Sequence, residues 1–367
     1  MEGRISSISF SKIKERIKVK KGKELQNRAR IRPVVGISAG DPAGIGPEIS
    51  AKALALKEIY EVCRPFVVCD LKVINEAIGF SGLSLKTRRI QSLSHATFEA
   101  GTIDVFDIEN VDMRSLEHKK VNAMCGKASY EYVRKIIKLA MEGQIDATVT
   151  GPIHKGALYA AGLRHTGHTE IFAEITGTLD YTMMLAEGDF RVVHVSTHLP
   201  LREACDYVKR ERIERVIGLA GQALKKMGVK EPRIAVAGLN PHAGEGGLFG
   251  QEEIREISPA VEEMRRQGLK VEGPVPADTV FSKMLGGSYD VVVVMYHDQG
   301  HIPTKIKGFQ YDGETNSWSS MAGVNVTLGL PIVRTSVDHG VAFGKAGEGR
   351  ANPESMIQAI FTALRLI

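Results

Sequence analysis

The stretch VVGISAGDPAGIGPEIS, residues 34–50, joins an apolar, β-branched run to a helix-like pattern through a turn rich in glycine and proline. A turn at this place can hold a pyrophosphate, but the dinucleotide-binding loop needs the spacing G-x-G-x-x-G. The glycines here lack that spacing, and the chain contains no G-x-x-x-x-G-K-[ST] motif. We interpret the stretch as another kind of strand-to-helix turn, in which Pro47 starts the helix and Glu48 complements the helix dipole.

Similar apolar runs recur along the chain and end in Gly, Asp, His or Asn: residues 33–38, 66–70, 146–151, 191–198, 233–240 and 290–298. Continuous hydrophobicity is typical of strands that are buried on both faces of a parallel sheet. Amphipathic helical stretches lie between these runs, at 127–142, 208–227 and 250–267. The alternation predicts an α/β fold.

Length and hydropathy limit the class of protein. The 367 residues are enough for two packed domains. No apolar run approaches the roughly 20 residues that cross a bilayer, so we expect no membrane partner. The four cysteines form no C-x-x-C pair, which indicates reduced thiols and a cytoplasmic location.

The positive charge is concentrated at one end of the chain. Residues 1–30 hold ten Lys and Arg against three Glu, a local charge of +7, whereas the whole chain carries +5. The remainder is therefore slightly acidic, and we expect no nucleic-acid partner for it. We interpret residues 1–30 as a solvated basic extension; contact with RNA or an acidic surface is the alternative.

Three histidines, His198, His242 and His297, follow predicted buried strands. Ligands of open α/β sheets bind outside the carboxyl ends of the strands, so the three side chains are expected at one edge. Three imidazoles and an open position form a catalytic metal site. Each of them taken alone has the alternative of a hydrogen-bonded loop histidine.

Other polar residues are candidates for binding an anion or a substrate oxygen. In GHTE, residues 167–170, His168 and Thr169 begin a predicted helix, where an ordinary N-cap by Thr169 is the alternative. Lys305 and Arg334 follow strand-like runs and are candidate anion ligands, although either could be an ordinary surface residue.

Eight ordered motifs carry a resemblance to a known family: GDPAGIGPE (40–48), TGPIHKGAL (150–158), GHTEIFAE (167–174), THLPLR (197–202), NPHAGEGG (240–247), PADT (276–279), YHDQG (296–300) and VNVTLGLPIVRTSVDHG (324–340). Together they resemble the 4-hydroxythreonine-4-phosphate dehydrogenase family of vitamin B6 biosynthesis. GDPAGIGPE also resembles the GDGIGPE turn of isocitrate and isopropylmalate dehydrogenases, which bind NAD without a Rossmann fingerprint. DHGVAFGKAGEGRANP (338–353) resembles the segment of those enzymes that lines the adenosine end of the dinucleotide.

The resemblance implies an isocitrate/isopropylmalate dehydrogenase-like fold of two α/β domains with a cleft between them. After the extension, one domain is expected to contain residues 31–150 and 305–367 on the cofactor side. The other, residues 151–304, is expected to hold the metal ligands and the dimer interface. The family is homodimeric, with active sites at the subunit interface.

The resemblance also implies a role for each matching residue. It assigns metal binding to His198, His242 and His297; substrate binding to His168, Thr169, Lys305, Asn325 and Arg334; catalysis to Asp278, Asp298 and Lys305; and cofactor binding to Gly40, Gly44, His339, Gly340 and Asn352. The implied cofactors are NAD or NADP and a divalent metal, Zn, Mg, Co or Mn. The implied reaction is oxidation and decarboxylation of a 4-phosphorylated 3-hydroxy acid.

One segment departs from the family pattern. The chain between Lys305 and Asn325 is longer than in the pyridoxine-pathway form and contains the single tryptophan. HDQGHIPTK, residues 297–305, resembles a second branch that acts on D-threonate or D-erythronate 4-phosphate in sugar-acid catabolism. That branch is the alternative substrate class, and a metal-dependent hydrolase or aldolase is a more distant one. A non-enzymatic ligand-binding or RNA-associated protein is the alternative of another class.

Overall fold

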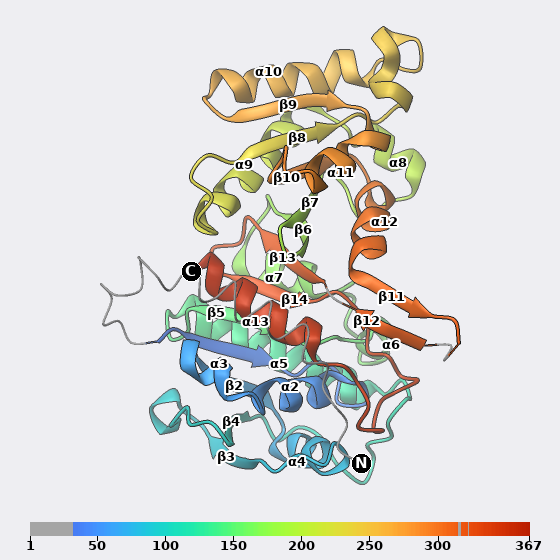
Figure 1. The fold of residues 1–367 in the computed structure, drawn as a ribbon. Coiled ribbons are helices and arrows are strands. Elements are labelled where there is room, and N and C mark those ends of the chain that lie inside the picture. The colour runs from blue at the N-terminus through green and yellow to red at the C-terminus, as the bar shows by residue number, and fades with distance from the viewer. Residues whose placement is uncertain (1–31, 315–316, 322) are drawn as a thin grey trace. The chain divides into compact units, whose positions relative to one another are not determined.

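The computed structural model describes residues 32–314, 317–321 and 323–367, so the expectations for residues 1–30 lie outside the described part. Residues 33–367 form one compact unit. Its described strands build a twelve-stranded sheet in the order β3-β4-β2-β1-β5-β14-β13-β6-β7-β10-β8-β9 (Figure 1). The predicted α/β class is confirmed.

The sheet has two sets of strands that differ in their place along the chain. The first set is β3 (Lys86–Ile90), β4 (Thr102–Asp107), β2 (Arg64–Cys69), β1 (Val34–Ser38), β5 (Ala147–Thr150), β14 (Arg334–Val337) and β13 (Val324–Leu328). The second is β6 (Thr182–Glu187), β7 (Phe190–His194), β10 (Val291–Val294), β8 (Arg233–Ala237) and β9 (Lys270–Val275). The pairings β14-β13, β13-β6 and β6-β7 are antiparallel, and the others in this sheet are parallel.

The predicted domain division follows this strand order. All strands of the first set come from residues 31–150 and 305–367, and all strands of the second set come from residues 151–304. The sheet itself is continuous across the β13-β6 pair. The division into domains therefore stays a prediction.

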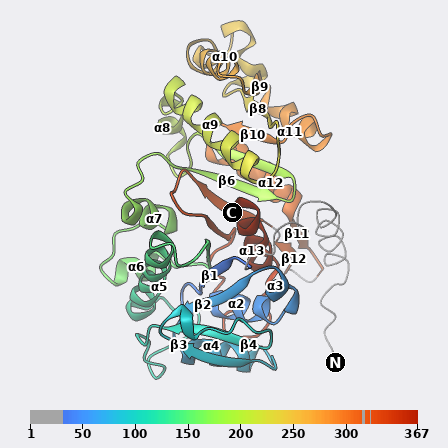
Figure 2. The ribbon, with the colours of Figure 1, turned by 90° about the vertical axis from the view of Figure 1, so that its left-hand side faces the viewer.

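Helices cover both faces of the sheet. Figure 2 shows α5 (Ala123–Met141), α6 (Lys155–Ala160) and α7 (His168–Thr176) on one side of β1 and β2, with α3 (Lys57–Val62) and α13 (Glu354–Leu366) on the other. The remaining helices are α2 (Gly46–Leu54), α4 (Leu71–Phe80), η1 (Leu93–His95), α8 (Leu201–Asp206), α9 (Arg210–Lys226), η2 (Pro241–Gly247), η3 (Glu253–Ile257), α10 (Ser258–Arg266), α11 (Ala277–Leu285) and α12 (His297–Gly308). No helix among the described residues is both long and apolar enough to span a membrane.

The predicted strands are found, but several end earlier than the apolar runs do. The run 191–198 forms a strand only to His194, the run 233–240 only to Ala237, and the run 290–298 only to Val294. The first residues after these strands, such as Val195 and Met295, are still fully buried, so the apolar run continues past the end of the strand. The three candidate histidines consequently lie three to five residues beyond the strands and do not follow them directly.

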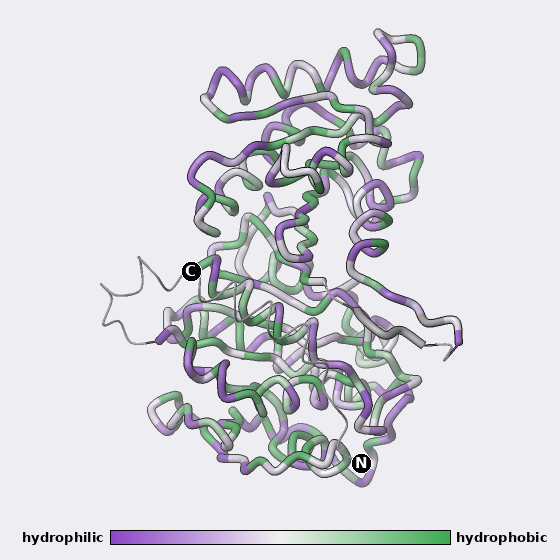
Figure 3. Tube along the Cα trace, in the orientation of Figure 1, coloured by the Kyte–Doolittle hydropathy of each residue, from purple (hydrophilic) through white to green (hydrophobic). Residues whose placement is uncertain are grey.

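The core consists of the apolar residues of the strands and of the inner helix faces. Strand residues such as Ile37, Val67, Val149 and Val293 are fully buried, and the hydropathy colouring of Figure 3 follows these runs. Burial of each such side chain contributes roughly 1.5–3 kcal/mol relative to an exposed position. This contribution explains why continuous apolar runs identify the strands.

The segment between Lys305 and Asn325 forms in part an antiparallel hairpin of β11 (Phe309–Asp312) and β12 (Ser317–Met321). The two strands pair with each other as a separate two-stranded sheet (Figure 1). The side chain of Trp318 lies outside the described residues.

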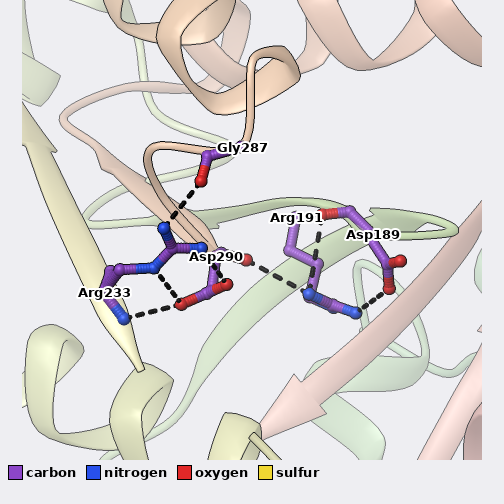
Figure 4. Close-up of polar contacts among 5 residues, drawn as sticks. All are labelled: Asp189, Arg191, Arg233, Gly287 and Asp290. Atoms are coloured by element: carbon purple, nitrogen blue, oxygen red, sulfur yellow. Dashed lines mark hydrogen bonds and ion pairs between the residues drawn. The ribbon is translucent and has the colours of Figure 1, made fainter. Parts of the chain in front are cut away.

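Two arginines fasten the amino ends of β7, β8 and β10 (Figure 4). Arg233 binds the carboxylate of Asp290 through Nε and Nη2 at 3.1 and 2.9 Å. Arg191 is buried, donates to the main-chain carbonyl of Asp290 at 3.2 Å and pairs with Asp189 at 2.5 Å. The amino edge is thus occupied by structural ion pairs, and the opposite edge is where a ligand site is expected.

The turn that opens the sequence analysis is shaped by close packing of main chain. Gly40 has φ +83°, and a Cβ there would lie 2.3 Å from the carbonyl oxygen of Pro152. A Cβ on Gly46 would lie 1.9 Å from the carbonyl oxygen of Ala39. The α2 helix has proline in its first turn, as expected. These glycines let the β1-α2 turn and the loop after β5 touch.

We predict that Gly40→Ala destabilises the protein much more than Gly82→Ala does. Gly82 also has positive φ, +63°, but a Cβ there would meet nothing within 4 Å. The control should cost about 1 kcal/mol for the left-handed backbone alone. Gly40→Ala should cost about 2 kcal/mol more, because the added carbon overpacks against main chain. Urea unfolding of both variants measures the difference; equal free energies of unfolding would contradict the packing account.

Candidate active site

Strand register places three polar side chains in one row. Ser336 of β14 pairs with Thr150 of β5, and Asn325 of β13 pairs with Ser336. Paired residues on neighbouring strands point to the same face of a sheet. Arg334 lies two residues before Ser336, so it points to this face too. Thr335, which points the other way, donates to the carbonyl of Ala359 in α13.

Arg334 is a buried cation with incomplete hydrogen bonding. Its Nη1 donates to Thr327 Oγ1 at 2.8 Å, and its Nη2 donates to Thr150 Oγ1 at 3.1 Å. The guanidinium carbon lies 5.5 Å from the ring centroid of Phe172 in α7. Nε is buried and has no partner among the described residues. Burial lowers the Arg334 pKa to about 10, so the group is still charged at neutral pH.

His168 begins α7 and lies over the same face. The N-cap is Gly167 and no side chain caps the helix, so the alternative of an N-cap by Thr169 is wrong. The Nε2 atom of His168 is buried without a partner among the described residues. Burial, and then the charge of Arg334, lower the His168 pKa well below its ordinary value. Its imidazole is neutral and can donate or accept one further hydrogen bond.

Asn325 completes this group. Its Nδ2 contacts the sulfur of Met183 at 2.8 Å, and its buried Oδ1 has no partner in the described part of the chain. Three predicted substrate ligands, His168, Asn325 and Arg334, therefore each present an unsatisfied buried polar atom. Leaving such an atom unpaired costs roughly 1–3 kcal/mol, which a polar ligand can offset.

A pocket of about 130 Å³ opens beside these residues. Its walls are the loop after β5, the start of α7 and the end of β14, with lining residues Thr150, Gly151, Pro152, Ile153, Lys155, Gly167, His168, Ser336, Val337 and His339. His168 and His339, assigned to substrate and cofactor in the sequence analysis, thus line one pocket. Lys155 was not predicted, although it lies within the quoted motif TGPIHKGAL.

Lys305 lies near the pocket through an acidic partner that the sequence did not single out. Its Nζ is 3.3 Å from Oδ2 of Asp338 and 4.4 Å from the ring centroid of Phe309. Burial raises the pKa of Asp338, and Lys305 opposes this shift. Asp338 stands between Val337 and His339, which both line the pocket. The pair can hold or pass on a proton beside it.

Two of the three predicted metal ligands are neighbours. The rings of His198 and His297 have centroids 5.7 Å apart. Nδ1 of His297 is 2.6 Å from Oδ1 of Asp298. Because the carboxylate can only accept, Nδ1 carries the hydrogen and Nε2 is free to bind a metal. The pKa of His198 is lowered by desolvation and by Lys155, which links this pair to the pocket.

The third, His242, lies on a strained turn. Residues 242–246 all have positive φ, from 44° to 78°, although three of them are not glycine. Buried Glu253 holds this turn: its carboxylate accepts from the main-chain N–H groups of Leu239 and Asn240 at 2.8 and 2.7 Å and from the Asn240 side chain at 2.8 Å. Non-glycine residues with such backbone cost about 1–3 kcal/mol each and cluster at functional sites.

Within one chain, the described residues do not bring the three histidines together. No group of three or more His, Cys, Asp or Glu in the described residues could hold a metal ion. His242 is exposed, with the ring of Phe249 at 6.3 Å. Asp278 is exposed in the first turn of α11, which packs on η2, the turn of His242.

The predicted cofactor residues lie on two loops that touch. A Cβ on Gly44 would lie 2.9 Å from Cβ of Val341, next to Gly340. Lys52 of α2 donates three hydrogen bonds, to Glu48 Oε1 at 2.7 Å and to the carbonyls of Gly349 and Ala351 at 2.9 and 2.8 Å. The exposed Asn352 accepts from the main-chain N–H of Glu354 at 2.9 Å. Helix α2 thus anchors the segment that ends at Asn352.

Solved structures match most of the described fold. A 4-hydroxythreonine-4-phosphate dehydrogenase from Burkholderia phymatum has a TM-score of 0.78 and 42% identity, covering 92% of this chain and 99% of that one. The enzyme of the same name from Klebsiella pneumoniae gives 0.79 and 42%, with coverages of 91% and 99%.

The sequence comparisons agree with the structures. A Clostridium botulinum protein named "Putative D-threonate 4-phosphate dehydrogenase" is 45% identical over 334 residues, 91% of this chain and 97% of that protein. The family model described as "Pyridoxal phosphate biosynthetic protein PdxA" matches residues 61–363. Because this match spans most of the chain, the protein is an oxidoreductase that belongs to the family of the pyridoxal phosphate biosynthetic protein PdxA.

Proposed function

We propose that the protein oxidises and decarboxylates a four-carbon, 4-phosphorylated 3-hydroxy acid, with NAD and a divalent metal. The observation that carries this proposal is the convergence of three unpartnered buried polar atoms, on His168, Asn325 and Arg334, at one face of the sheet. A phosphate or carboxylate offers the acceptors that Arg334 Nε needs. An anion bound there would also bring a negative charge to a buried positive one.

The residues that we propose to bind the anion differ in charge. Arg334 neutralises the ligand, while neutral His168 donates or accepts according to its tautomer. Asn325 Oδ1 can only accept, so it suits a hydroxyl of the substrate. Thr169 follows His168 in the first turn of α7 and is half-buried, and we propose that its hydroxyl binds the same ligand.

The donors at His198 and His297 fit a divalent metal. Both are imidazoles, and the Asp298 bond leaves Nε2 of His297 free. A bound metal would lower the pKa of the substrate hydroxyl and polarise the carbonyl formed from it. The pair Lys305 and Asp338 then receives the hydroxyl proton at Asp338 Oδ2, whose pKa is raised by burial.

A second copy of the chain is the source we propose for the third ligand. His242 is exposed, and the helix that carries Asp278 packs on its turn. Exposed apolar side chains surround the histidine segments: Ile302 and Ile306 on α12, Leu199 and Leu201 near His198, and Leu248 and Phe249 near His242. A symmetric dimer would cover these side chains and complete two sites, each with His242 and Asp278 from the partner.

The residues assigned to the cofactor would hold NAD next to the substrate residues. A bound NAD would supply the hydride acceptor for the substrate carbon. His339 lines the pocket, and Gly340 follows it. Gly40 and Gly44 let the neighbouring turn pack closely, and Lys52 holds the main chain before Asn352. The same residues are compatible with NADP.

The pocket lining favours a hydroxyl over an amine at the second carbon of the substrate. Its ten residues include Lys155, His168 and His339 but no carboxylate. An ammonium group there would lie near the Lys155 cation, while Asp338, which stands between two lining residues, is already paired with Lys305. This arrangement is unfavourable for an ammonium group. D-threonate or D-erythronate 4-phosphate is therefore favoured over 4-hydroxythreonine 4-phosphate. We place the enzyme in the cytoplasm, consistent with four free cysteines.

Turnover should reveal both the reaction and the substrate. With NAD and a divalent metal, we expect NADH absorbance to grow with D-threonate or D-erythronate 4-phosphate, and at least about tenfold more slowly with 4-hydroxythreonine 4-phosphate. Carbon dioxide release should accompany it. Product formation without NADH would support a hydrolase or aldolase and would contradict the proposal.

Mixed dimers should test the shared metal site. We expect His242→Ala and His297→Ala each to lower activity by at least about a thousandfold, because each removes one metal ligand. Subunits of the two variants, unfolded and refolded together, should recover about a quarter of wild-type activity, since half of the dimers would contain one intact site. Refolding each variant alone is the control. No recovery on mixing would mean that the three histidines act within one chain.

Inorganic phosphate should stabilise the anion site. At about ten times its Kd, phosphate should raise the Tm of the wild type by about 2 °C. Arg334→Met should lose this shift. Arg191→Met is the matched control, because Arg191 is equally buried and also has an unpartnered Nε, but lies at the opposite edge of the sheet. A phosphate shift that persists in Arg334→Met would refute the assignment.

A further inference from the structure

Four imidazoles form a series that runs from the core to the proposed metal site, and the last two belong to that site. His194, at the end of β7, is fully buried, and its ring centroid lies 4.9 Å from that of His301 in α12. His301 stacks on His297 with centroids 3.6 Å apart and planes within 10°. His297 faces His198 at 5.7 Å. The two inner histidines have no part in the function proposed above.

Hydrogen bonds fix the orientation of the inner rings. Nδ1 of His301 is 3.0 Å from the carbonyl oxygen of His297, one helical turn earlier. Nδ1 of His194 is 3.2 Å from the carbonyl oxygen of Met183. A carbonyl only accepts, so both Nδ1 atoms carry the hydrogen. The ring of His301 is thus held at its own helix and cannot turn freely.

Packing behind His301 removes its remaining freedom. A Cβ on Gly300 would lie 2.5 Å from Nε2 of His194 and 2.7 Å from Cγ1 of Val192. The missing side chain lets the first turn of α12 sit directly on β7 and β10. His301 itself is only 8% exposed, so protein atoms cover most of its surface.

His297 itself has little else to hold its ring. Among the described residues, its ring is hydrogen-bonded to the carboxylate of Asp298, which is 68% exposed and open to competition from water. A hydrogen bond to Nδ1 fixes the tautomer but allows the ring to swing about that contact. The flat face of His301 supplies the second constraint, because parallel stacking fixes the plane of the ring.

We propose that His301 is a positioning residue, whose stacked ring holds the imidazole of His297 in the plane needed to bind the metal. The inference rests on the proposed function, in which His297 is a metal ligand. It assigns a specific purpose to the second histidine of HDQGHIPTK, the motif that resembles the sugar-acid branch of the family. An aliphatic residue of similar size would fill the same space without a flat face.

Three substitutions separate stacking from the other contacts of His301. His301→Phe keeps a flat ring and loses the hydrogen bond; His301→Asn keeps a donor and loses the ring; His301→Leu loses both. His95→Leu, at an exposed position in η1, is the control for a histidine-to-leucine change. Isothermal titration of each metal-free protein with Zn²⁺ alone gives Kd, and the Co²⁺ absorption spectrum reports ligand geometry.

We expect His301→Leu and His301→Asn to weaken Zn²⁺ binding about tenfold and to change the Co²⁺ spectrum, as loss of a ligand-orienting neighbour does. His301→Phe and His95→Leu should stay close to the wild type. A Zn²⁺ affinity equal to the wild type in His301→Asn or His301→Leu would overturn the inference. If His297→Ala loses Zn²⁺ binding in the same experiment, the proposed metal site is still supported. Zn²⁺ binding that is unchanged in His297→Ala would overturn the metal site and the inference together. Thermal unfolding shows whether each variant folds.

Discussion

The hydrogen-bond register of β5, β14 and β13 is the constraint on which the candidate site depends. It places Ser336 beside Thr150 and Asn325 beside Ser336, and it therefore turns Arg334 to the face covered by α7. A slip of one residue would move Arg334 to the face of α13, where Thr335 now bonds Ala359. Antiparallel β13, the strand just before β14 in the chain, brings Asn325 into the row.

Burial of Arg334 lowers the stability of the protein and at the same time provides a cation for ligand binding. Among the described residues, the guanidinium donates hydrogen bonds to Thr327 and Thr150, and both acceptors are neutral hydroxyls. The lowered pKa of Arg334 expresses the energy of holding a cation away from water. Arg233, by contrast, is paired with the carboxylate of Asp290 through two hydrogen bonds, so its charge already has an acidic partner. Incomplete pairing therefore costs stability in the empty site and contributes affinity when an anion binds.

The sequence predicted the fold class and the positions of the strands because both depend on local patterns, whereas several strands end earlier than their apolar runs. Continuous apolar runs identified β1, β5 and β10, and the motif order identified the family. Asp338 escaped prediction because its partner, Lys305, is 33 residues away in the sequence. Glu253 escaped because its contacts with Leu239 and Asn240 depend on how the η2 turn folds, and Lys155 because its place at the pocket depends on the loop after β5. The stack of His301 on His297 also escaped prediction. Two histidines four residues apart share a helix face, but the apolar run did not show that the strand ends at Val294 and that a helix begins at His297.

In the proposed metal site, the strained turn of His242 and the stacked ring of His297 would fix two metal ligands in different ways. A metal ligand must be fixed before the metal arrives, or binding has to offset the lost freedom of the side chain. On η2 the main chain is fixed, since Glu253 holds residues with left-handed backbone. On α12 the helix is regular, so only the side chain needs fixing, and His301 can do this by stacking. A ligand that must reach across an interface gains more from a rigid main chain, because any movement of the turn displaces the whole residue. A ligand that meets the metal within its own subunit needs only the ring plane to be set.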